Sequence, residues 1–298
     1  MALLKTNNCY IIGTLVEVKD FREITYGEDN REALSATIVV KSQLGEGDEN
    51  ASLIELKTFC SKLTKAGTVN KNYNTILHIK DLLNQRVVIS SATINGDRFW
   101  ASNTNQLVPV TRYNFNIIRP ASATQKDDKA EFSFGGFVYR ELSPRTDEDG
   151  NVLYYQISIA QANYKENNMH VVDFVIDKDN QAAIKAIEKM YEQGSTVEIS
   201  GICKNVVTTT VVKEEVAFGD PVEKTFTKTD KKLIITSGQS PIQGEGEYTI
   251  EAIKALNDAY TKEGIAIKDK ATSDNSSSST PNTVDSKPSK KSALAGLI

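Results

Sequence analysis

The sequence predicts a mainly β protein made of two tandem five-stranded barrels, because one pattern of strands occurs twice. The motif Tyr10-Ile-Ile-Gly13-Thr-Leu-Val16 recurs as Phe132-Ser-Phe-Gly135-Gly-Phe-Val138. Two further strands rich in β-branched residues, a partly helical stretch and two more strands follow each copy. Strand, strand, strand, helix, strand, strand is the element order of the OB fold. A repeat of about a hundred residues indicates a duplicated domain rather than a solenoid unit.

Breaks in the strand pattern divide the chain further. A polar stretch without apolar periodicity separates the barrels, and a long alternating segment predicts an extended hairpin with Gly219-Asp-Pro221 at its tip. Asp179 is the expected N-cap of the helix inside the second barrel, and Thr249 that of a C-terminal amphipathic helix. The predicted segments are barrel 1 (residues 1–119), a linker (120–130), barrel 2 (131–240), a helical segment (241–270) and a disordered tail with an apolar tip (271–298).

Composition and charge narrow the class of protein. The 298 residues include 39% hydrophobic and 25% charged residues, which is typical of a soluble globular protein of about two domains. No apolar run is long enough to cross a membrane, and Lys5 argues against a signal peptide. Three scattered cysteines suit a reducing compartment, so we expect a cytoplasmic protein. Residues 1–119 hold 14 basic and 12 acidic residues, and residues 120–240 hold 14 and 19, which favours barrel 1 as the binder of a polyanion.

The third strand of barrel 1 gives the clearest sign of a binding site. Strand alternation places Ile54, Leu56 and Thr58 on one face, and Glu55, Lys57 and Phe59 on the other. An exposed aromatic ring beside lysines, with Lys62 shortly after, suits stacking on bases combined with contacts to phosphates. The alternative is that a loop buries Phe59, as Phe prefers the core.

These residues resemble the bacterial and phage single-stranded DNA-binding protein family. The run Phe59-Cys60-Ser61-Lys62-Leu63 is similar to the end of that family's third strand, and Lys189–Gly201 and Leu233–Ser237 resemble its later helix and strands. The resemblance implies OB barrels and a stacking role for Phe59, with Phe174 as its counterpart in barrel 2. It further implies roles in DNA replication, recombination or repair, in the host cytoplasm if a phage encodes the protein.

Other candidate contacts combine aromatic rings with cations, a pairing that permits both stacking and cation–π interaction. Trp100 is the single tryptophan, and a place in the core or at an interface is the alternative for it. Residues in the first inter-strand loop lie where OB barrels often contact ligands, although that loop could equally be solvated. The predicted DNA-binding residues are Phe59, Lys57, Lys62, Trp100, Arg98, Arg112, Tyr113, Phe115, Arg22, Tyr26, Phe174 and Tyr154.

The sequence offers no catalytic or metal-binding constellation. His78 and His170 are the only histidines, and neither has a cysteine or carboxylate at metal-ligand spacing. We therefore expect no enzyme activity, no cofactor and no metal. The tail suggests a partner-docking peptide for replication or recombination proteins at Ala293–Ile298, with a frayed terminus as the alternative. Oligomers are possible.

The leading interpretation is a sequence-tolerant single-stranded DNA-binding protein. A structural OB-domain protein of a virion or other assembly, and an RNA-binding module, remain open alternatives, because OB barrels serve many tasks.

Overall fold

The first five long strands close into a barrel in the computed structural model, which describes residues 3–47, 50–214 and 222–277. Antiparallel pairs join β1 to β2 and β4, β2 to β3, and β4 to β5, while β3 pairs in parallel with β5. The order β1-β2-β3-β5-β4 therefore returns to β1. Its elements are β1 (Asn7–Tyr26), β2 (Arg31–Gln43), β3 (Ala51–Ser61), α1 (Lys71–Leu77), η2 (Ile79–Leu82), β4 (Arg86–Ala101) and β5 (Gln106–Phe115).

Barrel 2 repeats this topology. Strands β7-β8-β9-β11-β10 are paired in the same sequence of antiparallel and parallel contacts, and β10 closes the ring on β7. Its elements are β7 (Lys129–Thr146), β8 (Val152–Ala162), β9 (Met169–Asp177), α2 (Gln181–Met190), β10 (Thr196–Glu214) and β11 (Val222–Gly238). The predicted fold class, mainly β with two OB-like barrels, is confirmed.

Two local predictions are refined by the barrel 2 elements. Asn180 rather than Asp179 caps α2, because its Oδ1 accepts a hydrogen bond from the Ala183 amide at 3.2 Å. The long β10–β11 hairpin is present, with pairing as far as Glu214 and Val222. Its predicted tip, Gly219-Asp-Pro221, lies outside the described residues.

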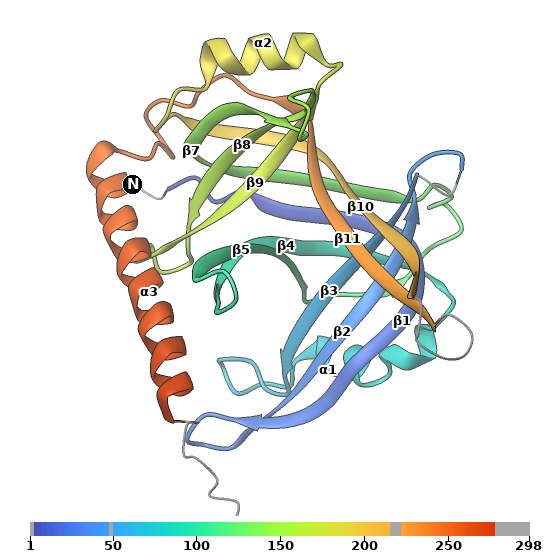
Figure 1. Ribbon diagram of the computed structural model, residues 1–298. Helices are drawn as coiled ribbons and strands as arrows, with labels where there is room; N and C mark the ends of the chain where they lie inside the picture. The colour runs from blue at the N-terminus through green and yellow to red at the C-terminus, as the bar shows by residue number, and fades with distance from the viewer. Residues whose placement is uncertain (1–2, 48–49, 215–221, 278–298) are drawn as a thin grey trace, which may run out of the picture.

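The two barrels share one continuous sheet (Figure 1). Buried residues of both barrels belong to one apolar cluster. Strands β1 and β7 pair antiparallel from Asn7 with Phe134 to Ile12 with Lys129. Ser52 Oγ of β3 donates to the Cys203 carbonyl of β10 at 2.9 Å, and the buried Cys9 and Cys203 sulfur atoms are 4.0 Å apart. The relative orientation of the barrels is therefore fixed by backbone pairing and shared apolar packing.

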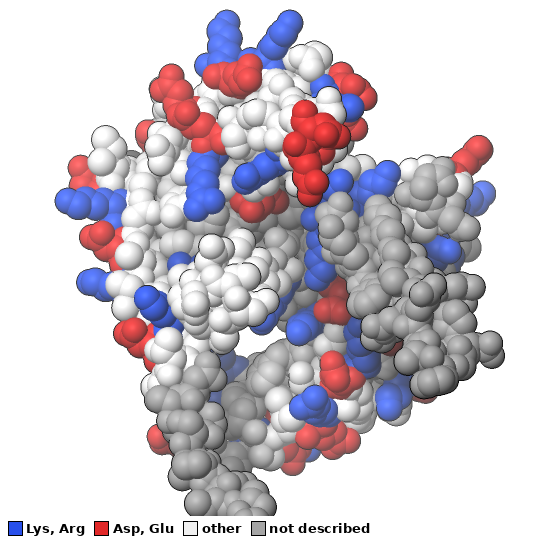
Figure 2. All heavy atoms as spheres, in the orientation of Figure 1, with Lys and Arg blue, Asp and Glu red and all other residues white. Residues whose placement is uncertain are grey.

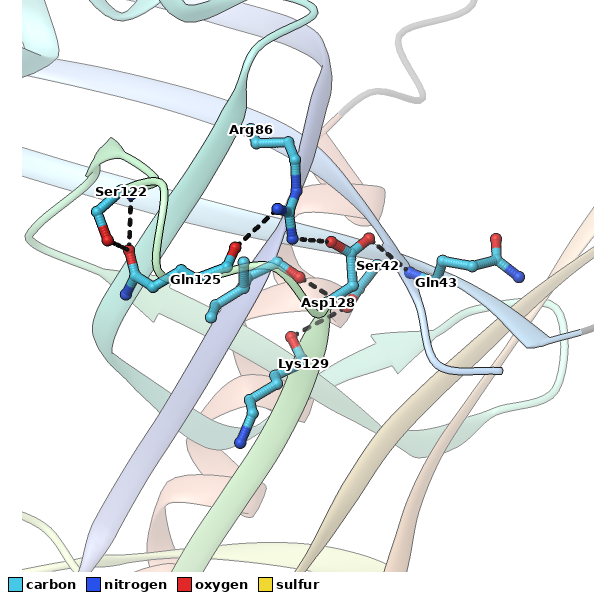
Figure 3. A network of polar contacts seen from close by, with 8 residues as sticks. Ser42, Gln43, Arg86, Ser122, Gln125, Asp128 and Lys129 are labelled. Atoms are coloured by element: carbon cyan, nitrogen blue, oxygen red, sulfur yellow. Dashed lines mark hydrogen bonds and ion pairs between the residues drawn. The ribbon is translucent and has the colours of Figure 1, made fainter. Parts of the chain in front are cut away.

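The segment predicted as a linker lies against barrel 1. The short β6 (Arg119–Pro120) pairs with β4, and the Asp128 carboxylate accepts from Arg86 Nη2 at 2.5 Å and from the Gln43 amide at 2.9 Å (Figure 3). Arg86 Nη1 also donates to the Gln125 carbonyl at 2.7 Å. These contacts hold the connection in place, so it does not act as a flexible tether between independent domains.

The C-terminal helix α3 (Ile250–Ser277) runs along one side of both barrels (Figure 1). Thr249 Oγ1 accepts from the Ala252 amide at 3.3 Å, which confirms the predicted cap. The helix continues seven residues beyond the expected boundary at residue 270, and residues 278–298, including the predicted tip Ala293–Ile298, lie outside the described residues.

Among the residues that the structure describes, no helix combines the length and the apolar character needed to span a membrane.

Candidate nucleic-acid interface

The outward face of β1, β2 and β3 carries the residues that the third strand predicted. Burial alternates along β3 as expected, with Ile54 and Leu56 fully buried and Phe59 50% exposed. Directly opposed residues on paired strands point to the same side of a sheet, so the register defines rows across this face. The rows are Glu17–Val39–Glu55, Lys19–Thr37–Lys57 and Arg22–Ser35–Phe59. Three cations, two carboxylates and one ring therefore share a face that is about 10 Å wide from β1 to β3.

Phe59 stands at the edge of a groove of about 890 Å³ formed by the end of β3, the β1–β2 turn and the loop after β3. The rings of Phe59 and Tyr26 form a T-shaped pair, with their centroids 5.0 Å apart. The Tyr26 hydroxyl lies 2.7 Å from Ser61 Oγ. Tyr26 thus supports one side of the Phe59 ring while half of that ring faces solvent. The structure rejects the alternative that a loop buries Phe59.

The groove is lined by charged side chains of both signs. Lys62 forms an ion pair with Glu32, and Arg31 pairs with Asp29 at 2.7 Å. The hydrogen bond that Lys62 donates to the Glu32 carboxylate raises the pKa of Lys62 above its usual value. Exposed pairs of this kind contribute about 0–1 kcal/mol, so an incoming phosphate can replace the carboxylate at little cost.

A second set of lysines surrounds Glu55 where barrel 1 meets barrel 2. Burial raises the pKa of the Glu55 carboxyl, but the hydrogen bond and charge of Lys19 and the charges of Lys231 and Lys57 outweigh it and lower this pKa overall. Lys19 Nζ lies 2.9 Å from Glu55. In Figure 2, Lys and Arg side chains line the hollow between the barrels, with Asp and Glu side chains among them. Lys19 Nζ also lies 3.8 Å from Glu17, so two carboxylates and three lysines meet in this region.

The equivalent face of barrel 2 differs in charge. Its rows are Arg140–Ser158–Asp173, Ser143–Gln156–Val175 and Arg145–Tyr154–Asp177. Asp173 and Asp177 therefore occupy the strand that carries Lys57 and Phe59 in barrel 1. Phe174 points the other way and is completely buried, against Phe132 and Phe134. The prediction of Phe174 as a stacking residue is wrong, because its side chain belongs to the inward set of β9.

Helix α3 covers the rest of that face. Phe137, Ala160 and Met169 of barrel 2 pack with Tyr248 and Leu256 in a second apolar cluster. The Tyr248 hydroxyl also accepts from the Ala162 amide at 3.0 Å. A strand of nucleic acid cannot lie where α3 lies, so the open sheet face belongs to barrel 1.

Arg98 and Trp100 also contact α3 rather than the groove. The Arg98 guanidinium lies 3.4 Å from the centre of the Tyr260 ring and donates to the Tyr260 carbonyl at 2.7 Å, and 11% of its side chain is exposed. Lys268 Nζ lies 5.5 Å from the centre of the Trp100 ring. Arg98 and Trp100, which the sequence predicted to contact DNA, therefore hold α3 against the β4–β5 hairpin.

Two more of the predicted rings are core residues. Tyr113 and Phe115 point into barrel 1 and are 1% exposed, because β5 turns this side of the strand inward. Their prediction as stacking residues is wrong. Arg112 points to the opposite, exposed side of β5 and pairs with Asp97 at 2.9 Å. Tyr154 is half-buried on barrel 2, with Lys232 Nζ 5.2 Å from its ring centre.

Lys19 and Lys65 join the interface although the sequence did not single them out as site residues. The pairing of Lys19 with Lys57 through Thr37 depends on a β-bulge in β1 between Lys19 and Arg22, at Asp20 with φ of 54°. Bulges of this kind shift which side chains share a face, and sequence alternation alone does not reveal them.

Within the described residues, no cluster of three or more His, Cys, Asp or Glu side chains is arranged to hold a metal ion.

Comparison with solved structures finds similar folds at low identity. A deletion mutant of the single-stranded DNA-binding protein from Thermus aquaticus is 11% identical, with a TM-score of 0.50 over 80% of this chain and 96% of that chain. The wild-type protein from the same organism is 11% identical, with a TM-score of 0.48 over 82% and 97%. At this identity the likeness to the mutant shows a shared fold alone. No curated protein matches the chain. A family model described as YorF matches residues 5–273, so the chain belongs to the YorF family.

Proposed function

We propose that this protein binds single-stranded DNA without strong sequence preference and has no catalytic activity. The observation that carries the proposal is the half-exposed Phe59 ring in a row with Arg22 and beside Lys57, on an open sheet face. Aromatic rings stack on any base, and cations contact phosphates, so this combination favours an unpaired strand over a duplex whose bases are already stacked.

The solved structures with a similar fold add support, since their names describe single-stranded DNA-binding proteins. The role in replication, recombination or repair, the phage origin and the cytoplasmic location rest on the resemblance of the sequence motifs alone. They form part of the proposal, as does the recruitment of partner proteins by the tip Ala293–Ile298.

The test is the affinity for fluorescently labelled oligo-dT, measured by polarisation. Phe59→Ala removes the exposed ring, and we expect binding to weaken by about 5- to 150-fold, since stacking contributes about 1–3 kcal/mol per base. Phe59→Trp keeps a stacking surface and is expected to retain the affinity. Phe99→Ala is the matched control, because Phe99 is 46% exposed on β4, outside this sheet face.

An affinity of Phe59→Ala within about twofold of wild type, or an equal loss in Phe99→Ala, would place the site elsewhere. Matched RNA and DNA strands in competition decide between the two nucleic acids, because only RNA offers the 2′-hydroxyl. Binding that is insensitive to salt would contradict the role given to Arg22 and Lys57.

A further inference from the structure

Tyr164, in the β8–β9 loop of barrel 2, is the most exposed large hydrophobic side chain in the described part of the chain, at 87%. The loop around it is well held. The Asn163 amide donates to the Asn168 carbonyl at 2.8 Å, and the Lys5 ammonium lies 2.6 Å from the Glu166 carboxylate. An aromatic ring on an ordered loop is a contact surface that needs little further ordering when a ligand binds.

A single exposed ring is common on protein surfaces, so its surroundings decide its meaning. Lys65 Nζ lies 5.6 Å from the centre of the Tyr164 ring. Lys65 also lines the groove of barrel 1 together with Phe59 and Lys62. The ring from barrel 2 therefore stands at the margin of the groove in barrel 1, and one lysine contacts both.

The spacing between this ring and the groove is fixed. The β1–β7 pairing joins the barrels, and the Asn7 side chain donates to the Ile94 carbonyl at 2.7 Å and to Gln161 Oε1 at 3.0 Å, next to the β8–β9 loop. A Cβ at Gly96 would lie 1.9 Å from the Val171 carbonyl oxygen, so the two backbones are in direct contact there. Tyr164 and Phe59 are therefore held as parts of one rigid surface.

We propose that Tyr164 is a second stacking platform for the strand that enters the Phe59 groove, so that barrel 2 completes the site of barrel 1. This inference rests on the proposed function. One face of the ring receives the Lys65 cation, and the other face is open to a base. Barrel 2 contributes through this loop, since its own sheet face carries Asp173 and Asp177 and is partly covered by α3.

The test uses oligo-dT of increasing length, because a strand must extend beyond the groove to reach the ring. OB barrels occupy about 4–16 nucleotides, so the series spans that range. Tyr164→Ala is expected to weaken binding of the longest strand by about 5- to 150-fold and to leave the shortest bound strand within about twofold of wild type. Tyr164→Phe keeps the ring and is expected to match wild type.

Two further variants sharpen the readout. Leu153→Ala is the control, because Leu153 is 53% exposed at the opposite end of β8, about 30 Å away along the strand, and is expected to bind as wild type. Tyr164→Trp provides a signal independent of affinity, since its added fluorescence is expected to be quenched when a base stacks on it.

The outcomes separate this inference from the proposed function. If Phe59→Ala loses affinity while Tyr164→Ala binds every length as wild type, the stacking role of Tyr164 is wrong and the function stands. If Tyr164→Phe is as weak as Tyr164→Ala, the hydroxyl rather than the ring makes the contact, which also overturns the inference. Failure of the wild type to bind oligo-dT would overturn both.

Discussion

If the protein binds single-stranded DNA as proposed, the ion pair between Lys62 and Glu32 should compete with the phosphates of the strand. Both side chains are about half exposed, at 50% and 56%, and both line the groove. A phosphate that binds Lys62 must take the place of the Glu32 carboxylate. We therefore expect Glu32→Gln to strengthen the binding of oligo-dT and Lys62→Gln to weaken it.

The structure sets the size of both effects. An exposed pair contributes about 0–1 kcal/mol, so releasing Lys62 from Glu32 is expected to raise affinity by up to about fivefold. Loss of one phosphate contact lowers the slope of log K against log salt by about 0.7 for a single strand. From 50 to 200 mM salt, the affinity ratio of wild type to Lys62→Gln should therefore fall by about 2.5-fold.

Titrations of labelled oligo-dT at several salt concentrations measure both variants and the double variant. If Glu32 acts by holding Lys62, the gain from Glu32→Gln disappears when Lys62 is already Gln. A gain of equal size in both backgrounds would refute this reasoning, because Glu32 would then act by repelling phosphate directly. An unchanged salt slope in Lys62→Gln would remove Lys62 from the phosphate contacts.

Two further predictions concern stability, measured by urea unfolding. Burial lowers the pKa of His170 to about 4, so the unfolded chain takes up a proton first as the pH falls below about 6.5. This group should therefore contribute a loss of about 2–3 kcal/mol in the stability of the wild type between pH 7 and 4.5. His170→Phe should lack this part of the acid sensitivity, and equal pH profiles would contradict the prediction. Asp128→Ala removes the acceptor of the Gln43 amide and of Arg86 Nη2, and should lower the free energy of unfolding by about 1–3 kcal/mol. The loss should be smaller in Asp128→Asn, and no loss would mean that the connection is not anchored there.

The sequence predicts the barrels and the Phe59 face because alternation is clear there. Buried Ile54, Leu56 and Thr58 alternate with exposed Lys57 and Phe59, so the side of each residue can be assigned. In β9 both sides are apolar at the start, since Val171 faces the α3 cluster while Val172 faces the core. Alternation is then lost, and a shift by one residue exchanges the two faces. The role predicted for Phe174 comes from the resemblance to the family's third strand, and that match does not show which face of β9 carries the ring.

The contacts of Arg98 and Trp100 were beyond sequence reasoning for a different reason. Their neighbours Tyr260 and Lys268 lie about 160 residues later in the chain, on a helix whose docking site depends on the finished barrels. Exposed rings and cations on a hairpin look the same in sequence whether a nucleic acid or a helix covers them. The place of Tyr164 beside Lys65 depends equally on the orientation of one barrel relative to the other.

The duplication therefore gives two copies of one sheet face with different uses. In barrel 1 the face carries Lys19, Lys57 and Arg22 and needs no cover, because cations and a supported ring are stable in water. In barrel 2 the corresponding face exposes apolar residues that α3 buries, and Asp173 and Asp177 repel phosphates from the remainder.

The groove is lined by Arg31, Lys62 and Lys65 against Asp29 and Glu32, so it has one more cation than carboxylates. A negative barrel joined to this groove would direct a polyanion toward it, since the field of the whole molecule acts on its approach. The acidic charge of barrel 2 is thus compatible with the proposed strand binding and would confine a bound strand to the side of barrel 1.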